Sequence, residues 1–541
     1  MTLRRLFIAA AIFHVVVTLL LFVAGRMQLA PHLLDRDGIL AATSDSVMYQ
    51  QDALRPGAWR DATERFHVRL LAPFFRAFAP FRAGILAAEP LNLFCYLAIV
   101  GLTFAIGRET FDQRSGLVAA GVVALWPTFV LHTTQLLKDP LFIAATLALV
   151  VVIVSWLTTT YDWSRVVAAV VVLVAAAALL YRLRWQFGIV VLAIVVFGLV
   201  LLVARQLFER RLLLRNLASA AVALGAGLLI ASQADRTLVK VKPYPSPVRG
   251  ESKMVAGTGK HVTPLVVWVA HADRTGTTIG GIRARYNLSD AGARSPIDEQ
   301  VELRSASDVV AYLPRAIAIG FWAPFPDMWL TRGQNVGQAG RALAGAETAM
   351  MYVFELFAVL AIALPPRRLP ALLLFGIAAI GVTALGMVVS NVGTLYRFRY
   401  SFWILLIITG VAGAEKLAHR FRGRAAVVPV VACILALLAS CSHAARPDVI
   451  LTNLTGTQVD ALYLSPADAS TWEENVLGGD VLRDGDTVEI RFASPSRPRL
   501  WDLRAEGGGL RAEWKALDTG RIRRITLRGR RGAAVAELSA N

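Results

Sequence analysis

Apolar stretches of about twenty residues recur along most of this chain, and that length is what a helix needs to cross the hydrocarbon core of a membrane. The chain is 56% hydrophobic and only 17% charged, and its mean hydropathy is +0.55. A water-soluble globular chain does not need this much apolar surface. We therefore predict a polytopic α-helical membrane protein with about eleven transmembrane helices. The predicted spans are residues 5–25, 91–107, 116–133, 140–157, 166–181, 186–204, 216–232, 346–364, 370–390, 401–414 and 425–441.

Lysine and arginine are shared unequally between the two sides that these spans define. With the N-terminus in the cytoplasm, fifteen Lys and Arg residues fall in or beside the short cytoplasmic loops and five in the opposite short loops. The positive-inside rule therefore favours a cytoplasmic N-terminus and an outer C-terminus. Three larger segments then lie outside, namely 26–90, 233–345 and 442–541.

The first two outer segments carry different patterns. In 26–90, apolar residues at helical spacing, as in Val68 to Phe75, predict amphipathic helices lying on the membrane. Segment 233–345 begins rich in Pro and Gly, which predicts a stretch without regular structure. The aromatic run from Phe321 to Trp329 is too short to span and suits the headgroup zone. We expect it to form an interfacial helix or a re-entrant turn.

The tail, residues 446–541, follows a last predicted helix and junction at 425–445. Apolar and polar residues alternate in three stretches of the tail, which start at Val449, Thr487 and Arg524, and turn signals separate them. This pattern predicts a small β-sandwich outside the membrane. The tail contains no acidic or His cluster suited to acid–base chemistry, so we expect it to be dispensable for any chemical step.

The net charge of +18 would suggest nucleic acid in a soluble protein. Here most basic residues flank apolar spans, and no basic-aromatic nucleic-acid module is present, so membrane lipids and phosphates are the expected partners. Five basic residues lie in the outer short loops, against the positive-inside rule. Binding of a phosphate group would explain why they are there. They are Lys138, Arg182, Arg184, Arg397 and Arg399.

Two carboxylates lie on the same side as these five cations. Asp45 belongs to the first outer segment, and Asp139 closes the loop before the fourth span. Sugar transfer from a polyprenyl phosphate to a hydroxyl needs one base and cations for the phosphate, because the phosphate leaves as a stable anion. Glycosidases generally need a second carboxyl group as an acid. Asp45 is therefore the leading candidate for the base.

Each of these residues also has a purely structural interpretation. An Asp in a polar loop is usually just solvated, and an Arg at a helix end often snorkels to the interface. Lys138 and Asp139 could form a local ion pair, and Asp139-Pro140 also reads as an N-cap with Pro at the first helical position. The His residues are too scattered in sequence to predict a metal cluster. The location of all the candidates on one side of the membrane is what favours a shared site.

Several stretches resemble the GT-C glycosyltransferases, polytopic enzymes that use polyprenyl-phosphate sugars. The resemblance covers roughly residues 1–424 and is carried by these segments: Pro90-Leu91-Asn92, Gly107 to Phe111, Gly116 to Ala120, Ala124 to Pro127, Leu137 to Phe142 and Gly393 to Tyr400. It implies that Asp45 is the catalytic base and that Asp139 helps to shape the site. Many members carry an acidic pair where this chain has Asp45 between Ser44 and Ser46. No cofactor is therefore predicted, and a divalent metal ion is left open.

The resemblance implies an inverting hexosyltransferase of GT-C type in the bacterial inner membrane. It would move a sugar from a polyprenyl-phosphate donor to a glycan or lipid acceptor on the periplasmic face, with the tail as a periplasmic domain. Two alternatives stay open. One is a non-enzymatic membrane component of a polysaccharide-export system, with the tail as its docking module. The other is a transporter of lipid-linked sugars, which the lack of an inverted repeat disfavours.

Overall fold

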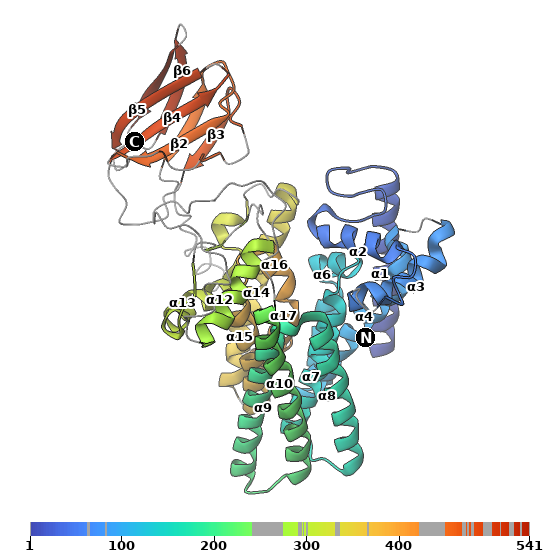
Figure 1. Ribbon diagram of the computed structural model, residues 1–541. Coiled ribbons are helices and arrows are strands. Elements are labelled where there is room, and N and C mark those ends of the chain that lie inside the picture. Colours follow the sequence, from blue (N-terminus) through green and yellow to red (C-terminus); the bar gives the residue numbers. More distant parts are fainter. Residues whose placement is uncertain are drawn as a thin grey trace. The chain divides into compact units, whose positions relative to one another are not determined.

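The computed structural model describes most of the chain as a helical region followed by a β-sheet region (Figure 1). The contacts divide the chain into two compact units, and the second contains everything from His443 onward. The described residues are 2–61, 65–81, 84–240, 274–289, 295, 297–298, 301–330, 336–364, 367–420, 449–467, 472, 475–477, 481–490, 500–508, 510–518, 524–530 and 533–539.

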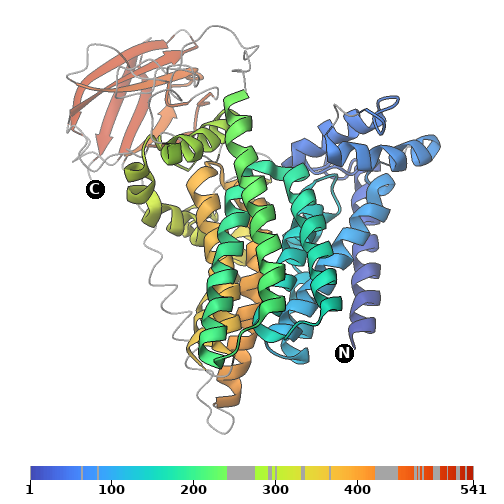
Figure 2. The ribbon, with the colours of Figure 1, turned by 60° about the horizontal axis from the view of Figure 1, so that its bottom comes forward.

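Helices make up most of the described residues of the first unit, and the long ones run alongside one another in both views (Figure 1, Figure 2). The first ten are α1 (Leu3–Arg26), α2 (Ser44–Leu54), α3 (Phe66–Phe78), α4 (Glu89–Thr110), α5 (Gln113–Ala124), α6 (Pro127–Thr133), α7 (Asp139–Thr158), α8 (Trp163–Arg184), α9 (Gly188–Glu209) and α10 (Leu214–Lys240). The later ones are α12 (Arg274–Ser289), α13 (Ala306–Trp322), α14 (Gly337–Ala363), α15 (Arg368–Val388), α16 (Val392–Phe398) and α17 (Tyr400–Arg420).

Eight helical stretches among the described residues are long and apolar enough to cross a membrane, which is the arrangement of a multi-pass membrane protein. One of them, Trp163–Glu209, contains both α8 and α9, which a short 3₁₀ turn separates. The pair α5 and α6 makes a ninth if it is counted as one bent span. The predicted spans up to 401–414 therefore coincide with helices, whereas 425–441 lies outside the described residues. The exact number of spans stays a prediction.

The predicted span 116–133 is not one straight helix. Its two halves, α5 and α6, meet at an angle of 67°. The break falls at Leu125 and Trp126, directly before Pro127, which starts α6. Proline disfavours helical geometry at the residue before it and suits the first turn of a new helix. The sequence therefore carried the signal for the break.

The outer segments contain shorter helices. In 26–90, α2 and the amphipathic α3 form with the turn Gly84–Ala88 a small apolar cluster of their own. The run from Phe321 to Trp329 does not form one helix, because α13 ends at Trp322 and a 3₁₀ turn follows at Pro326–Met328. How this run lies in the membrane stays a prediction. The Pro- and Gly-rich part of 233–345 lies outside the described residues.

Glycine allows two helix pairs to pack closely. Gly413 of α17 faces the backbone of α14, where an added Cβ would lie 1.8 Å from the Phe357 carbonyl oxygen. Gly386 of α15 faces α13 in the same way, at 2.1 Å from the Ala316 carbonyl oxygen. Small residues at helix contacts are typical of membrane bundles, where close backbone packing replaces the hydrophobic effect.

The described residues of the C-terminal unit form seven strands in two sheets around one apolar core that includes Leu451, Leu503 and Ile525. One sheet has the order β3-β1-β6-β7, with β1 and β6 parallel, and the other has the order β2-β4-β5. The strands are β1 (Val449–Leu454), β2 (Ala461–Pro466), β3 (Thr487–Ile490), β4 (Leu500–Gly507), β5 (Leu510–Asp518), β6 (Arg524–Arg530) and β7 (Ala533–Ser539). The prediction that the tail forms a small sheet region is confirmed, whereas its independent folding outside the membrane stays a prediction.

We expect Gly413→Ala to destabilise the helical unit by about 1–3 kcal/mol. The added methyl group would clash with the backbone of α14, which can move aside only if the two helices shift apart. Gly121→Ala in α5 is the matched control, since no atom lies within 4 Å of the added Cβ. Its higher helix propensity should stabilise α5 by about 1 kcal/mol. Thermal unfolding of both variants in detergent checks this, and an unchanged transition for Gly413→Ala would contradict the packing described.

Candidate functional site

Charged side chains from four separate parts of the chain meet at one end of the helical unit. Asp45 lies in the first turn of α2, Asp139 is the first residue of α7, Arg184 is the last residue of α8, and Arg397 belongs to α16. With Lys138, the residue before α7, they form what we call the Asp45 cluster. Acidic residues at the start of a helix and a basic residue at the end of one also suit the helix dipoles.

Arg397 links the two carboxylates of the cluster. Its Nη2 donates a hydrogen bond of 2.9 Å to Oδ2 of Asp45, and its Nε lies 3.0 Å from Oδ2 of Asp139. The second contact is a close ion pair that is not aligned as a hydrogen bond. The Asp45 side chain is 40% exposed, whereas that of Asp139 is only 6% exposed. Asp45 is therefore the carboxylate that another molecule can reach, and Asp139 is the buried anchor.

Arg184 is buried and only partly satisfied by the protein. Its Nη2 donates to Oδ1 of Asp139 in a very close contact, and its Cζ lies 3.5 Å from the centre of the Phe398 ring. Its Nε and Nη1 are buried and have no hydrogen-bond partner among the described residues. Buried donors without partners are costly in a folded protein. An anion or water that enters the cluster would satisfy them.

Lys138 adds a third positive charge to the cluster. Burial, together with the Arg184 guanidinium, lowers the pKa of Lys138 to about 8. At neutral pH the ammonium group is still mostly charged, yet in the described part of the chain it has no hydrogen bond or ion pair. The predicted local pair with Asp139 is not formed, because the Asp139 carboxylate faces the two arginines. The helix also starts one residue earlier than predicted, so Lys138 is the cap residue and Asp139 is the first residue of the helix.

Two of the five predicted phosphate ligands do not join the cluster. Arg182 is exposed on α8, two residues before Arg184. Arg399 is buried in a different environment, where its Nη1 donates to the Gly320 carbonyl oxygen at 3.1 Å and its Cζ lies 4.2 Å from the Trp403 ring centre. In the described part of the chain neither Arg182 nor Arg399 contacts the Asp45 cluster, and their role as phosphate ligands stays a prediction.

A buried hydrogen-bond network, which was not predicted from the sequence, supports α16. Glu347 of α14 accepts from the Thr128 backbone amide at 2.8 Å and from the hydroxyls of Thr128 and Tyr396 in closer contacts. The Thr128 hydroxyl also contacts the Tyr400 hydroxyl. Because Tyr396 precedes Arg397, this network fixes the helix that presents the arginine. An acidic residue inside a predicted span was the signal that could have revealed it.

Two aromatic residues at the cluster were also missed. Tyr49 lies one turn after Asp45 on α2 and packs edge-on against His67, with ring centres 5.3 Å apart. Burial and the nearby Asp45 and Asp139 charges raise the pKa of Tyr49 to about 12, so its hydroxyl stays protonated. His132 of α6 is close enough to interact electrostatically with Arg397 and Asp139. Neither residue stands in a pattern that sequence alone would single out.

The described residues contain no group of three or more His, Cys, Asp or Glu side chains arranged to hold a metal ion. The two carboxylates of the cluster face arginines instead.

Comparison with protein-family models, with curated proteins and with solved structures finds no match to this chain.

Asp139→Asn should destabilise the protein by about 3–5 kcal/mol, because two buried or nearly buried guanidinium groups would lose the carboxylate that neutralises them. Glu209→Gln is the control, since Glu209 pairs with Arg205 on the same helix but is 44% exposed, and its loss should cost at most about 0.5 kcal/mol. Unfolding of both variants in the same detergent measures the difference. Equal effects would show that Asp139 does not anchor the cluster.

Proposed function

We propose that this protein is an inverting membrane glycosyltransferase that takes a sugar from a polyprenyl-phosphate donor, with Asp45 as the general base. The observation that carries the proposal is that a reachable carboxylate is hydrogen-bonded to a cation inside a cluster with more cations than carboxylates. A base and a leaving-group site must be adjacent for this reaction, because attack and departure occur at one carbon.

The charge balance of the cluster suits this donor. Lys138, Arg184 and Arg397 contribute three positive charges, and Asp45 and Asp139 contribute two negative ones, which leaves one positive charge. The phosphodiester of a polyprenyl-phosphate sugar carries one negative charge. The buried donors of Arg184 and the unpaired Lys138 ammonium group are available to its oxygens.

The chemical step follows from these positions. The acceptor hydroxyl attacks the anomeric carbon while an oxygen of Asp45 accepts its proton. The bond between that carbon and the phosphate oxygen breaks, and the electron pair leaves with polyprenyl phosphate. The charge that develops on the leaving phosphate is stabilised by Arg397, Lys138 and Arg184. Attack opposite to the leaving group inverts the configuration at the anomeric carbon.

Asp139 and Glu347 would act as positioning residues. Asp139 holds Arg184 and Arg397 from the buried side, and Glu347 holds Tyr396 beside Arg397. Fixed cations cost little reorganisation when the leaving group gains charge. The proposed setting is the periplasmic face of a bacterial inner membrane, with a glycan or lipid acceptor and with the tail at the same face.

Asp45→Asn should lower the turnover of a polyprenyl-phosphate-linked hexose by about 10²–10⁴-fold, because the amide cannot accept the proton. Asp52→Asn is the matched control, since Asp52 lies on the same helix and pairs with Arg55 and Arg65 instead. The measurement is sugar transfer by the full chain in lipid vesicles, with thermal unfolding as a check on folding.

Near wild-type turnover by Asp45→Asn would rule out the assignment of the base. If the wild-type protein turns over none of a panel of polyprenyl-phosphate sugars, yet moves the same lipids across the membrane, the transporter alternative is correct. If it does neither, the non-enzymatic alternative is favoured.

A further inference from the structure

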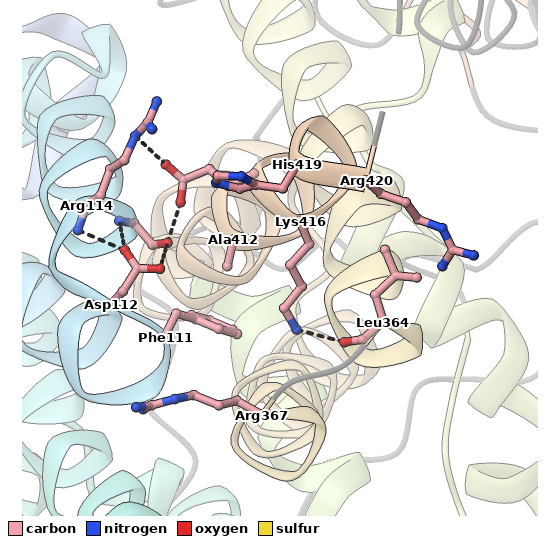
Figure 3. Close-up of a pocket in the computed structure, with 11 residues that line it drawn as sticks. Phe111, Asp112, Arg114, Leu364, Arg367, Ala412, Lys416, His419 and Arg420 are labelled. Atoms are coloured by element: carbon pink, nitrogen blue, oxygen red, sulfur yellow. Dashed lines mark hydrogen bonds and ion pairs between the residues drawn. The ribbon is translucent and has the colours of Figure 1, made fainter. Parts of the chain in front are cut away.

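A second cluster of charged residues lines a cavity at the other end of the helices, where α4, α14 and α17 end and α15 begins (Figure 3). The cavity has a volume of about 740 Å³. Phe111, Leu364 and Ala412 give it an apolar wall, while Arg367, Lys416 and Arg420 provide positive charge. Since α17 has 21 residues and rises about 1.5 Å per residue, this cavity is roughly 30 Å from the Asp45 cluster at the other end of α17.

Hydrogen bonds to helix ends hold two of these cations in place. Lys416 Nζ donates to the carbonyl oxygens of Ala361 and Leu364, at 2.8 and 2.9 Å, at the end of α14. Arg367 Nη1 donates to the Glu109 carbonyl oxygen at 2.8 Å, at the end of α4. A cation fixed in this way needs no further ordering when it binds an anion.

The carboxylates of the cavity are already used on its opposite side. Asp112 caps α5 by accepting from the backbone amides of Arg114 and Ser115, at 2.9 and 2.8 Å. Glu415 pairs with Arg114 at 3.2 Å and accepts from the Ser115 hydroxyl. Figure 3 shows Asp112 and Arg114 together on one side, with Lys416 and Arg420 across the cavity. The side of the cavity that carries Lys416 and Arg420 therefore has an excess of positive charge.

Arg420 is the cation best able to take a ligand. It is the last residue of α17, its side chain is exposed, and it has no carboxylate partner in the described part of the chain. Basic residues at the end of a membrane helix attract anionic headgroups, at about 1 kcal/mol each. Figure 3 shows its guanidinium reaching outward from the rim.

We propose that this cavity binds the phosphate headgroup of an acidic phospholipid. Lys416 and Arg420 would contact the phosphate, Arg367 would add positive charge at the far side of the cavity, and the start of an acyl chain would lie on Phe111 and Leu364. The apolar wall beside the cations suits an amphiphile, whereas a free phosphate ion gains nothing from it. The cavity lies at the ends of four helices that are long and apolar enough to span a membrane, where lipid headgroups are abundant.

The test uses the full chain, stripped of lipid in an uncharged detergent and examined by native mass spectrometry. Phosphatidylglycerol should be retained more strongly than phosphatidylcholine with the same acyl chains. Arg420→Gln should weaken phosphatidylglycerol binding about fivefold, the effect of one lost cation. The matched control is Arg211→Gln in the loop between α9 and α10, an exposed arginine that does not line this cavity. It should leave retention unchanged.

A second variant, Lys416→Gln combined with Arg420→Gln, should weaken retention further. If it fails to fold because the carbonyls of α14 lose their donor, Arg420→Gln still decides the question. Equal retention of the two lipids, or equal loss in Arg420→Gln and Arg211→Gln, would overturn the proposal. Displacement of phosphatidylglycerol by millimolar inorganic phosphate would also overturn it, since the site would then bind free phosphate.

Discussion

The ion pairs of Asp139 are the interaction on which the described site depends. Asp139 and Arg184 are almost fully buried at the end of an apolar bundle, where an unpaired charge is very costly. One carboxylate therefore has to serve two guanidinium groups, those of Arg184 and Arg397. Because these residues belong to α7, α8 and α16, the pairs join two consecutive helices to a third that lies far along the chain. Arg397 then extends the network to Asp45 on α2.

Some cationic groups of this network have no hydrogen-bond acceptor in the described part of the chain. Among the described residues, Arg184 keeps two buried donors without partners, and Lys138 makes no hydrogen bond or ion pair. Asp139 is already shared between the arginines, so it cannot supply what is missing. An entering phosphate would, and it would lie beside the one carboxylate that is partly exposed. This is the physical link between the fold and the proposed transfer reaction. The basic cavity at the opposite end of the helices, with its apolar wall, suits a lipid and not a reacting sugar.

The sequence predicted the helices well, because apolar length alone fixes where a span can form. It also marked Asp45, Asp139, Lys138, Arg184 and Arg397. It could not separate Arg184 from Arg182, since residues two apart on a helix point about 200° away from each other and either could face the bundle. It could not show either that Arg397 joins the cluster and Arg399 does not. Arg397 belongs to α16, whereas Arg399 is the residue between α16 and α17, and the sequence does not reveal this boundary. Glu347 lies within an apolar run, and its contacts with Thr128 and Tyr396 could not be predicted because they depend on how the helices pack.

The central claim is that the Asp45 cluster binds a lipid-linked phosphate through the arginines that face inward. Binding of a polyprenyl phosphate without sugar tests this without requiring turnover. Arg397→Gln should weaken binding about tenfold or more, the effect of one lost charge-assisted hydrogen bond. Arg182→Gln, the same change at an exposed position nearby, should bind as the wild-type protein does. If Arg397→Gln binds as tightly as the wild type, or if Arg182→Gln is weakened equally, the account of this site is wrong.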